Sequence, residues 1–402
     1  DRSKVNGVIN AESERQAREL LREQELLPTK LSAVAAFTKP VKKGQSIFSG
    51  FQGIFQRIFG VGSKEKIAFT RNMEMMLKSG IPLTEALFYF ENYMQNPVFK
   101  PVVSQIRKDI LAGYSFSQAL GKHKKLFSDV YLNVTKAGET SGELEESMSR
   151  LAELMMKQDK LKMKVISTMV YPVLVIVIMA IVLLVMFLFV LPTFADIYKQ
   201  QGVELPLLTQ ILLAISHAMQ NWWFIVFPMM GLAGYGVFIY CSKGAGKILW
   251  EKLMLTIPVV GELVKYVNNA HFISTFNVAF SAGLPITDAI YLGCLTVRHT
   301  QMRSAFQQVN VKIQAGQRLA EAMAQTGYVP DIVLLMLSTG DETGELEKML
   351  LSSHSYLEDE IDHRIGILTA MMEPVLLLVL GTVVLFIALA IYMPMFSMYE
   401  NI

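Results

Sequence analysis

The sequence predicts an all-α membrane protein with two repeated cytoplasmic six-helix bundles and three transmembrane helices. Three observations support this fold class: long uncharged apolar stretches, an internal repeat, and apolar residues that recur at helical spacings of three and four. Hydrophobic residues make up 52% of the 402 residues and charged residues 18%, below the roughly 25% of ordinary soluble domains. This composition excludes a disordered chain and does not suit a purely soluble enzyme.

The N-terminal part differs from the rest of the chain. Residues 1–37 are expected to form a partial module, a short hairpin remnant followed by a helix that Ser13 and Gln16 cap. Because the chain starts at Asp1 and not at Met, we expect this module to be truncated. Residues 38–66 are expected to be a linker with an amphipathic helix, which either lies in a membrane interface or packs on the bundle or on a partner.

Residues 67–167 are predicted to form the first cytoplasmic bundle, and residues 168–191 the first transmembrane helix. Within the bundle, Ser115 and Gln118 are typical of a capping box. The segment 168–191 contains no charged residue, and it exceeds the about 20 apolar residues that cross a bilayer.

The second half of the chain follows the same plan. The predicted segments are a short periplasmic loop (192–221), a second transmembrane helix (222–241), a second bundle (242–373), a third transmembrane helix (374–393) and a periplasmic tail (394–402). Three buried helices of a soluble core are the alternative, but core helices rarely stay uncharged for so long. Pro228 and the glycines of the second span are compatible with a membrane helix, because neighbouring helices satisfy the freed backbone groups.

Flanking lysine and arginine residues predict the orientation of these spans. Five precede the first span and three follow the second: Arg150, Lys157, Lys160, Lys162 and Lys164, then Lys243, Lys247 and Lys252. The segment 192–221 has only Lys199, and no basic residue follows Met393. We therefore expect a multi-pass protein of the bacterial inner membrane, with a cytoplasmic N-terminus, two cytoplasmic bundles and a periplasmic C-terminus. The first bundle is basic and the second acidic (net +8 for residues 1–165, net −4 for residues 243–373), which hints at contact between unlike bundles.

The two bundles are copies of each other. FTRNMEMMLKSGIPLTEAL at 69–87 matches FISTFNVAFSAGLPITDAI at 272–290, and GETSGEL at 138–144 matches GDETGEL at 340–346. The repeated positions are Gly80 and Gly283, Pro82 and Pro285, Gly113 and Gly316, Gly138 and Gly340, Gly142 and Gly344, and Pro172 and Pro374. The first glycine pair suits helix C-caps and the first proline pair the start of the next helix. Ser141 and Thr343 are expected to be N-caps.

No motif of catalysis or cofactor binding is found. CSKGAGKIL at 241–249 lacks the first glycine and the Ser/Thr of a P-loop, and neither HExxH nor GxSxG occurs. Glu139 and Glu143 are weak metal candidates, although a capping or solvated acidic face is the favoured interpretation. The two cysteines are expected to be buried thiols. A nucleic-acid partner is not expected, since no zinc spacing or RNP motif accompanies the basic half.

With this repeat and topology, the chain resembles the polytopic inner-membrane platform proteins of type IV pili and type II secretion, the GspF/PilC family. The resemblance lies in the two repeated motifs above, in EPVLLLVLGTVVLFIALAIYMPMF at 373–396, and in GVINAESERQARELL at 7–21. It implies a non-enzymatic, homo-oligomeric platform that docks a cytoplasmic hexameric ATPase. The platform would couple that ATPase to insertion or removal of pilin or pseudopilin subunits. Its further expected partners are other inner-membrane assembly proteins and the lipid bilayer.

Alternatives remain at this stage. A small membrane transporter or channel component would need polar groups near the bilayer midplane, and these spans have almost none. Lys122, Lys124 and Lys125 form a basic patch without an equivalent in the second copy. This patch would contact an acidic ATPase face or anionic lipid, or it is a plain solvated turn. The bundles are expected to act as levers on the membrane helices near Pro172 and Pro374.

Overall fold

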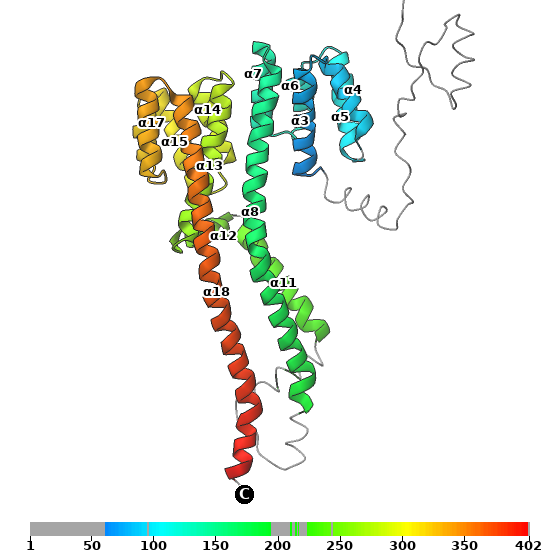
Figure 1. Ribbon diagram of the computed structural model, residues 1–402, viewed down its shortest axis with the longest axis vertical. Coiled ribbons are helices and arrows are strands. Elements are labelled where there is room, and N and C mark those ends of the chain that lie inside the picture. Colours follow the sequence, from blue (N-terminus) through cyan, green and yellow to red (C-terminus); the bar gives the residue numbers. More distant parts are fainter. Residues whose placement is uncertain are drawn as a thin grey trace, which may run out of the picture. The chain divides into compact units, whose positions relative to one another are not determined.

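The structure is a computed structural model that describes residues 61–94, 96–193, 210, 214, 216, 223–242 and 244–400 (Figure 1). The chain divides into two compact units, 1–60 and 61–402. The predicted N-terminal module and nearly all of the linker therefore lie outside the described residues, as does most of the predicted periplasmic loop. All regular elements of the described part are helices, which confirms the predicted all-α class.

The first bundle contains six helices around an aromatic core. They are α3 (Ser63–Lys78), α4 (Leu83–Tyr93), α5 (Phe99–Leu111), α6 (Phe116–Gly121), α7 (Asp129–Ser141) and α8 (Leu144–Val185). The ring of Phe69 meets those of Phe90 and Phe99 edge-on at 5.3 and 5.6 Å. The tilted ring of Phe127 lies 5.9 Å from that of Phe69 and 5.0 Å from that of Tyr131. Such aromatic pairs add stabilisation beyond the burial of their area, so the core joins α3, α4, α5 and α7.

The second bundle repeats these six helices in the same order. They are α13 (Val260–Ser281), α14 (Ile286–Thr296), α15 (Thr300–Gln314), α16 (Leu319–Ala324), α17 (Asp331–Thr343) and α18 (Leu346–Glu400). Phe272, Phe276 and Phe306 are fully buried at its centre. Cys294 is buried beside them, and burial raises the pKa of its thiol to about 12. The two predicted six-helix bundles are thus present.

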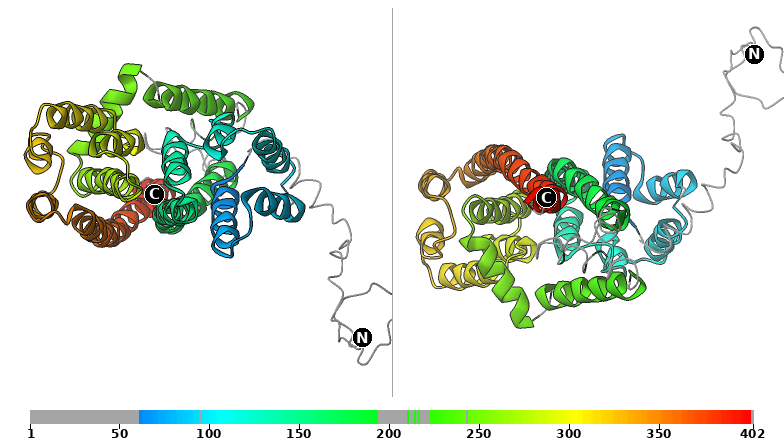
Figure 2. Two further views of the ribbon diagram at one scale, coloured as in Figure 1. Left: turned by 90° about the horizontal axis from the view of Figure 1, so that it is seen from above. Right: turned by 90° about the horizontal axis from the view of Figure 1, so that it is seen from below.

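The sixth helix of each bundle continues without a break into an apolar segment. The helical run Leu144–Thr193 and the helix stretch Leu346–Leu389 are long and apolar enough to cross a membrane, and their most apolar windows are not buried by the rest of the chain. A short π-helical stretch, Met186–Val190, lies near the end of the first run. Figure 2 shows α8 and α18 side by side between the bundles, where they contact each other.

Two further helices connect the halves. They are α11 (Trp223–Ser242), which coincides with the second predicted span, and α12 (Gly244–Thr256). Among the described helices, only the stretches of α8 and α18 are long and apolar enough to cross a membrane by length and composition. Three membrane crossings therefore remain a prediction. In Figure 1, α12 runs across the end of the second bundle at the height where α18 leaves it.

Candidate functional site

The repeated GETSGEL and GDETGEL motifs form the turn that joins each bundle to its long helix. Gly142 and Gly344 close α7 and α17 in the left-handed conformation, with φ of 79° and 75°. A residue with a Cβ is strained at such a φ. The turn thus reverses the chain within two or three residues, and α8 and α18 start antiparallel to the helices before them.

The prediction that Ser141 and Thr343 are N-caps is wrong. Ser141 is the last residue of α7 and Thr343 the last of α17. The N-cap of α8 is Glu143, whose side chain makes no capping hydrogen bond. The reason is the glycine that follows each hydroxyl residue. Gly142 and Gly344 end the preceding helices, so Ser141 and Thr343 are still part of those helices and do not start the next ones. The Ser141 hydroxyl accepts a hydrogen bond from the Glu143 N–H at 3.4 Å and donates one to the Gly138 carbonyl oxygen at 3.4 Å.

Gly138 and Gly340 lie one turn before this reversal, where two helices touch. A Cβ on Gly138 would stand 2.0 Å from Ser147 Oγ, 2.6 Å from Ser147 Cβ and 3.0 Å from the Glu143 carbonyl oxygen. A Cβ on Gly340 would stand 3.0 Å from both the Leu346 Cα and the Met349 Cβ. Gly138 lies inside α7 and Gly340 inside α17, and neither belongs to the loop that follows. Both let the long helix pack directly on its neighbour.

The other repeated positions also occupy matching places in the two copies. Gly80 and Gly283 have φ of 77° and 82°, and Gly113 and Gly316 have φ of 95° and 89°. Pro82 and Pro285 stand directly before α4 and α14. Pro172 lies inside α8, and Pro374 lies inside α18. These residues mark helix ends and the long helices, and they do not converge on one site.

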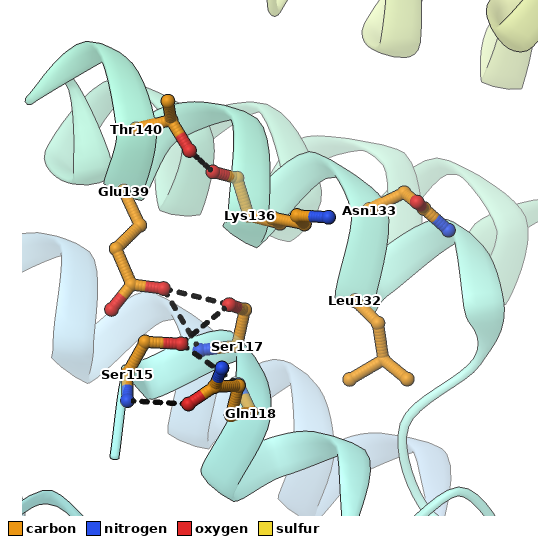
Figure 3. A pocket seen from close by; sticks show the side chains of 8 residues that line it. All are labelled: Ser115, Ser117, Gln118, Leu132, Asn133, Lys136, Glu139 and Thr140. Carbon is orange, nitrogen blue, oxygen red and sulfur yellow. Dashed lines mark hydrogen bonds between the residues drawn. The ribbon is translucent and has the colours of Figure 1, made fainter. Parts of the chain in front are cut away.

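The carboxylate of Glu139 caps a helix. It accepts hydrogen bonds from the Ser117 N–H at 3.1 Å and from the Ser117 hydroxyl at 2.7 Å (Figure 3). It also accepts one from the Phe116 N–H at 2.6 Å. These donors start α6, where Ser115 and Gln118 form the predicted capping box. Glu139 therefore ties α7 to α6, because its oxygens satisfy backbone donors that no carbonyl reaches. Among the described residues, no three His, Cys, Asp or Glu side chains gather as a metal site would require.

A shallow hollow lies between α6 and α7 beside this cap. It has a volume of about 340 Å³, and Figure 3 shows its lining. The lining residues are Ser115, Ser117, Gln118, Leu132, Asn133, Lys136, Glu139 and Thr140. Its polar groups are largely engaged with one another, as in the capping box and the Glu139 contacts. The Ser117 hydroxyl and the Glu139 carboxylate that meet there both belong to the cap of α6.

The predicted basic patch is only partly free. Lys122 Nζ lies 3.0 Å from the nearly buried Asp109 carboxylate and 3.7 Å from the centre of the Tyr114 ring. The hydrogen bond from Lys122 lowers the pKa of Asp109, against the opposing effect of burial. Lys124 and Lys125 are exposed. They are the two lysines of the patch that a partner can reach without breaking this pair.

The two bundles meet along α8, α13 and α18. Lys164 forms an ion pair with Asp362 across this contact. Buried His354 lies near His271 and Lys157, with Glu358 at 3.7 Å. Burial lowers the pKa of both histidines to about 4, helped by the positive charge of Lys157 for His354 and of Arg298 for His271. Both imidazoles are therefore neutral at neutral pH.

Sequence reasoning missed a second carboxylate cap. Glu251, on α12, accepts hydrogen bonds from the Thr300 N–H at 2.9 Å and from the Thr300 hydroxyl at 3.1 Å. These donors start α15, so α12 is attached to the second bundle. The only signal in the sequence is one acidic residue within the apolar and basic stretch 244–256.

Comparison with known proteins gives a consistent picture. The sequence profile of the family described as type II secretion system (T2SS), protein F, matches residues 69–192 and 272–394. The profile of that protein's N-terminal domain matches residues 2–32. The double match has the same spacing as the internal repeat and ends at corresponding prolines, Pro192 and Pro394.

Named relatives match over most of the chain. The type IV pilus assembly protein TapC of Aeromonas hydrophila is 32% identical, over 98% of this chain and 92% of its own. The type IV pilus assembly protein PilC of Myxococcus xanthus is 35% identical, over 84% and 81%. The type II secretion system protein F of Pseudomonas aeruginosa is 27% identical, over 98% and 95%. The similarity thus includes pilus assembly and secretion proteins.

Proposed function

The chain belongs to the protein F family of the type II secretion system, and on this premise we propose that it is a non-enzymatic assembly platform in the bacterial inner membrane. It would serve a type IV pilus or a type II secretion machine. Its relatives carry names from both, so the family alone does not favour one.

The observation that carries the proposal is the continuity of α8 and α18. Each starts at a tight glycine turn inside a bundle and runs on into an apolar segment. At 1.5 Å per residue, the 55 residues of α18 make a rod about 80 Å long. A displacement of either bundle is then passed to its apolar segment without a flexible joint. This is the property that a lever between a cytoplasmic motor and a membrane assembly site needs.

The proposed membrane arrangement follows from exposure and charge. Large apolar side chains in the C-terminal part of α18 are exposed in the isolated chain, as lipid-facing residues must be. Leu378, for example, has an exposed fraction of 71%. Basic residues precede the apolar segment of α8, and none follows Met393, which supports bundles in the cytoplasm and a C-terminus in the periplasm. α11 would return the chain to the cytoplasm, so that both copies share one orientation.

The proposed partners are a hexameric assembly ATPase on the cytoplasmic side, pilin or pseudopilin subunits within the membrane, other inner-membrane assembly proteins, and further copies of this chain. Lys124 and Lys125 are the proposed contact with the ATPase. They are exposed on the first bundle, whereas the matching segment of the second copy, residues 325–330, contains no basic residue. The two bundles would then have different partners.

A salt-dependent pull-down tests the coupling to the ATPase. The full chain, in detergent, is mixed with the assembly ATPase of the same organism at increasing salt concentration. Binding should weaken with salt, because surface charges are screened, and the double variant K124E/K125E should bind several-fold less than wild type. The matched control K100E/K108E changes two exposed lysines of α5 by the same charge and should bind as wild type. An equal loss of ATPase binding in both variants would contradict the contact assigned to Lys124 and Lys125. If the wild type, also when reconstituted into proteoliposomes, did not bind the ATPase, the proposed coupling to the ATPase would be contradicted.

A further inference from the structure

Helix α12 has an apolar face that nothing in the described chain covers. The face consists of Leu249, Leu253 and Ile257, spaced four residues apart, with Trp250 beside them. Their exposed fractions are 68%, 54% and 42% for the stripe and 44% for Trp250. Leu249, Trp250 and Leu253 lie on the 13-residue helix itself, and Ile257 directly follows its last residue, Thr256. Together they are more than the scattered exposure that ordinary surfaces show.

The opposite side of α12 is attached to the second bundle. Glu251 caps α15 through Thr300, as described above, and only 12% of its side chain is exposed. The ends of the helix are equally constrained. A Cβ on Gly246 would stand 2.2 Å from the Tyr240 carbonyl oxygen of α11, and one on Gly261 would stand 2.3 Å from the Leu255 carbonyl oxygen. The apolar face is therefore held in place by α11, α13 and α15.

The position of α12 corresponds to the boundary between charged and apolar parts of the long helix. α13 follows α12 after three residues, and its Glu262 pairs with Arg364 of α18 at 3.2 Å. Arg364 is the last basic residue of α18, and Glu373 is the only charged residue between it and Leu389. α12 itself follows α11 after a single residue. In Figure 1 it runs across the end of the bundle at this height, not along α18.

The composition of α12 fits the surface of a bilayer. A helix that lies in the headgroup layer has Leu and Trp on one side and lysines beside them, and its apolar face enters about 5–10 Å into the headgroup and acyl boundary. Lys252 is exposed next to the stripe, and Lys247 is partly exposed while it pairs with Glu251 at 3.5 Å. Anionic lipid headgroups complement these ammonium groups, and Trp is enriched at this depth.

We propose that α12 is an interfacial helix whose stripe of Leu249, Leu253 and Ile257 lies in the headgroup layer of an anionic bilayer, and that it holds the second bundle at the membrane surface. The inference rests on the membrane placement proposed above. Because Glu251 joins α12 to α15, the attachment of α12 to the membrane would restrain the second bundle directly. The membrane-spanning part of α18 would restrain it a second time. The second bundle would then be restrained at two points.

Depth-dependent quenching of a fluorophore tests this inference in the full chain. A single environment-sensitive probe is attached to Leu253→Cys, in a Cys241→Ser background that retains the buried and weakly reactive Cys294. The protein is reconstituted into vesicles of phosphatidylcholine and phosphatidylglycerol that carry a nitroxide quencher either near the headgroup or deep in the acyl chain. Leu335→Cys is the matched control, since Leu335 is a leucine of the same bundle with 62% exposure. Leu378→Cys, at 71% exposure, reports the apolar part of α18.

The expected result is several-fold stronger quenching at position 253 than at position 335 by the shallow quencher, and quenching at 378 by the deep one. Quenching at 378 together with equal, weak quenching at 253 and 335 would overturn the interfacial helix and leave the membrane placement standing. Absence of quenching at 378 as well would instead contradict the membrane placement itself. If the 253 variant does not reconstitute, Ile257→Cys probes the same face with the same two outcomes.

Discussion

Alanine at Gly138 should loosen the joint between the first bundle and its long helix. The added methyl group would lie 2.0 Å from Ser147 Oγ and 2.6 Å from Ser147 Cβ, whereas non-bonded carbon atoms prefer about 3.5–4.0 Å. α7 and α8 must therefore separate, and overpacking of this kind costs about 1–3 kcal/mol. Alanine also favours the helix by about 1 kcal/mol relative to glycine. The two effects oppose each other, and the expected net loss of stability is at most about 2 kcal/mol.

A second substitution separates the contact from a general effect of alanine. Ser147→Gly removes both atoms that lie closer than 3.0 Å to the new methyl group and leaves only the Glu143 carbonyl oxygen, at 3.0 Å. The double variant G138A/S147G should therefore be more stable than the sum of the single variants predicts. A coupling energy of at least about 1 kcal/mol is expected, as for residues in direct contact.

Pulse proteolysis of the full chain in detergent, across a urea series, measures these differences as shifts of the unfolding midpoint. Gly121→Ala is the matched control, because it adds a methyl group to the same bundle where no atom lies within 4 Å and where φ is not positive. G138A should unfold at lower urea than both wild type and G121A. A midpoint equal to that of G121A, or no recovery in the double variant, would refute the argument that these helices touch at Gly138.

Two further predictions use the same measurement. Lowering the pH from about 7 to about 5 should destabilise the chain by roughly 2 kcal/mol for each of His271 and His354. The folded pKa of about 4 lies below the ordinary 6.5, so stability is complete above pH 6.5 and falls as the unfolded state takes up protons first. His354→Leu should lose about half of this pH dependence, and an unchanged dependence would contradict the buried neutral imidazole. Glu139→Ala should cost about 1–2 kcal/mol, because it leaves the first donors of α6 without their acceptor, and Glu139→Gln, which keeps one oxygen, should cost less.

Local features of the fold could be predicted from the sequence because short-range geometry determines them. The Ser115–Gln118 capping box, the left-handed glycines and the six helices of each copy depend on residues within one or two turns. The N-cap assignment of Ser141 failed at the same scale. Two signals competed there, since a Ser can start a helix and a following glycine can end the one before it, and the glycine prevailed.

Contacts between distant residues could not be predicted. Glu139 caps a helix 22 residues earlier and Glu251 one 49 residues later, and no spacing rule connects such pairs. Burial also changes the meaning of charged residues: Lys122 belongs to a basic run in the sequence, but in the structure it neutralises Asp109. The continuity of α8 was hidden for another reason, because Pro172 suggests a boundary, while the helix accommodates it.

The repeat separates what both bundles need from what each needs alone. Both keep the close glycine and the left-handed glycine at the joint with the long helix, so in the proposed lever mechanism either bundle would move its apolar segment. The pairs on their surfaces differ. At the positions of Asp109 and Lys122, the second copy has Lys312 and Gln325, which are also hydrogen-bonded to each other. Each copy thus keeps the link between its third and fourth helices while its charge is reversed or lost. Since the transmission of movement is shared and the surface charge is not, a motor that docks by charge would engage one bundle, and the other would remain available for a different partner.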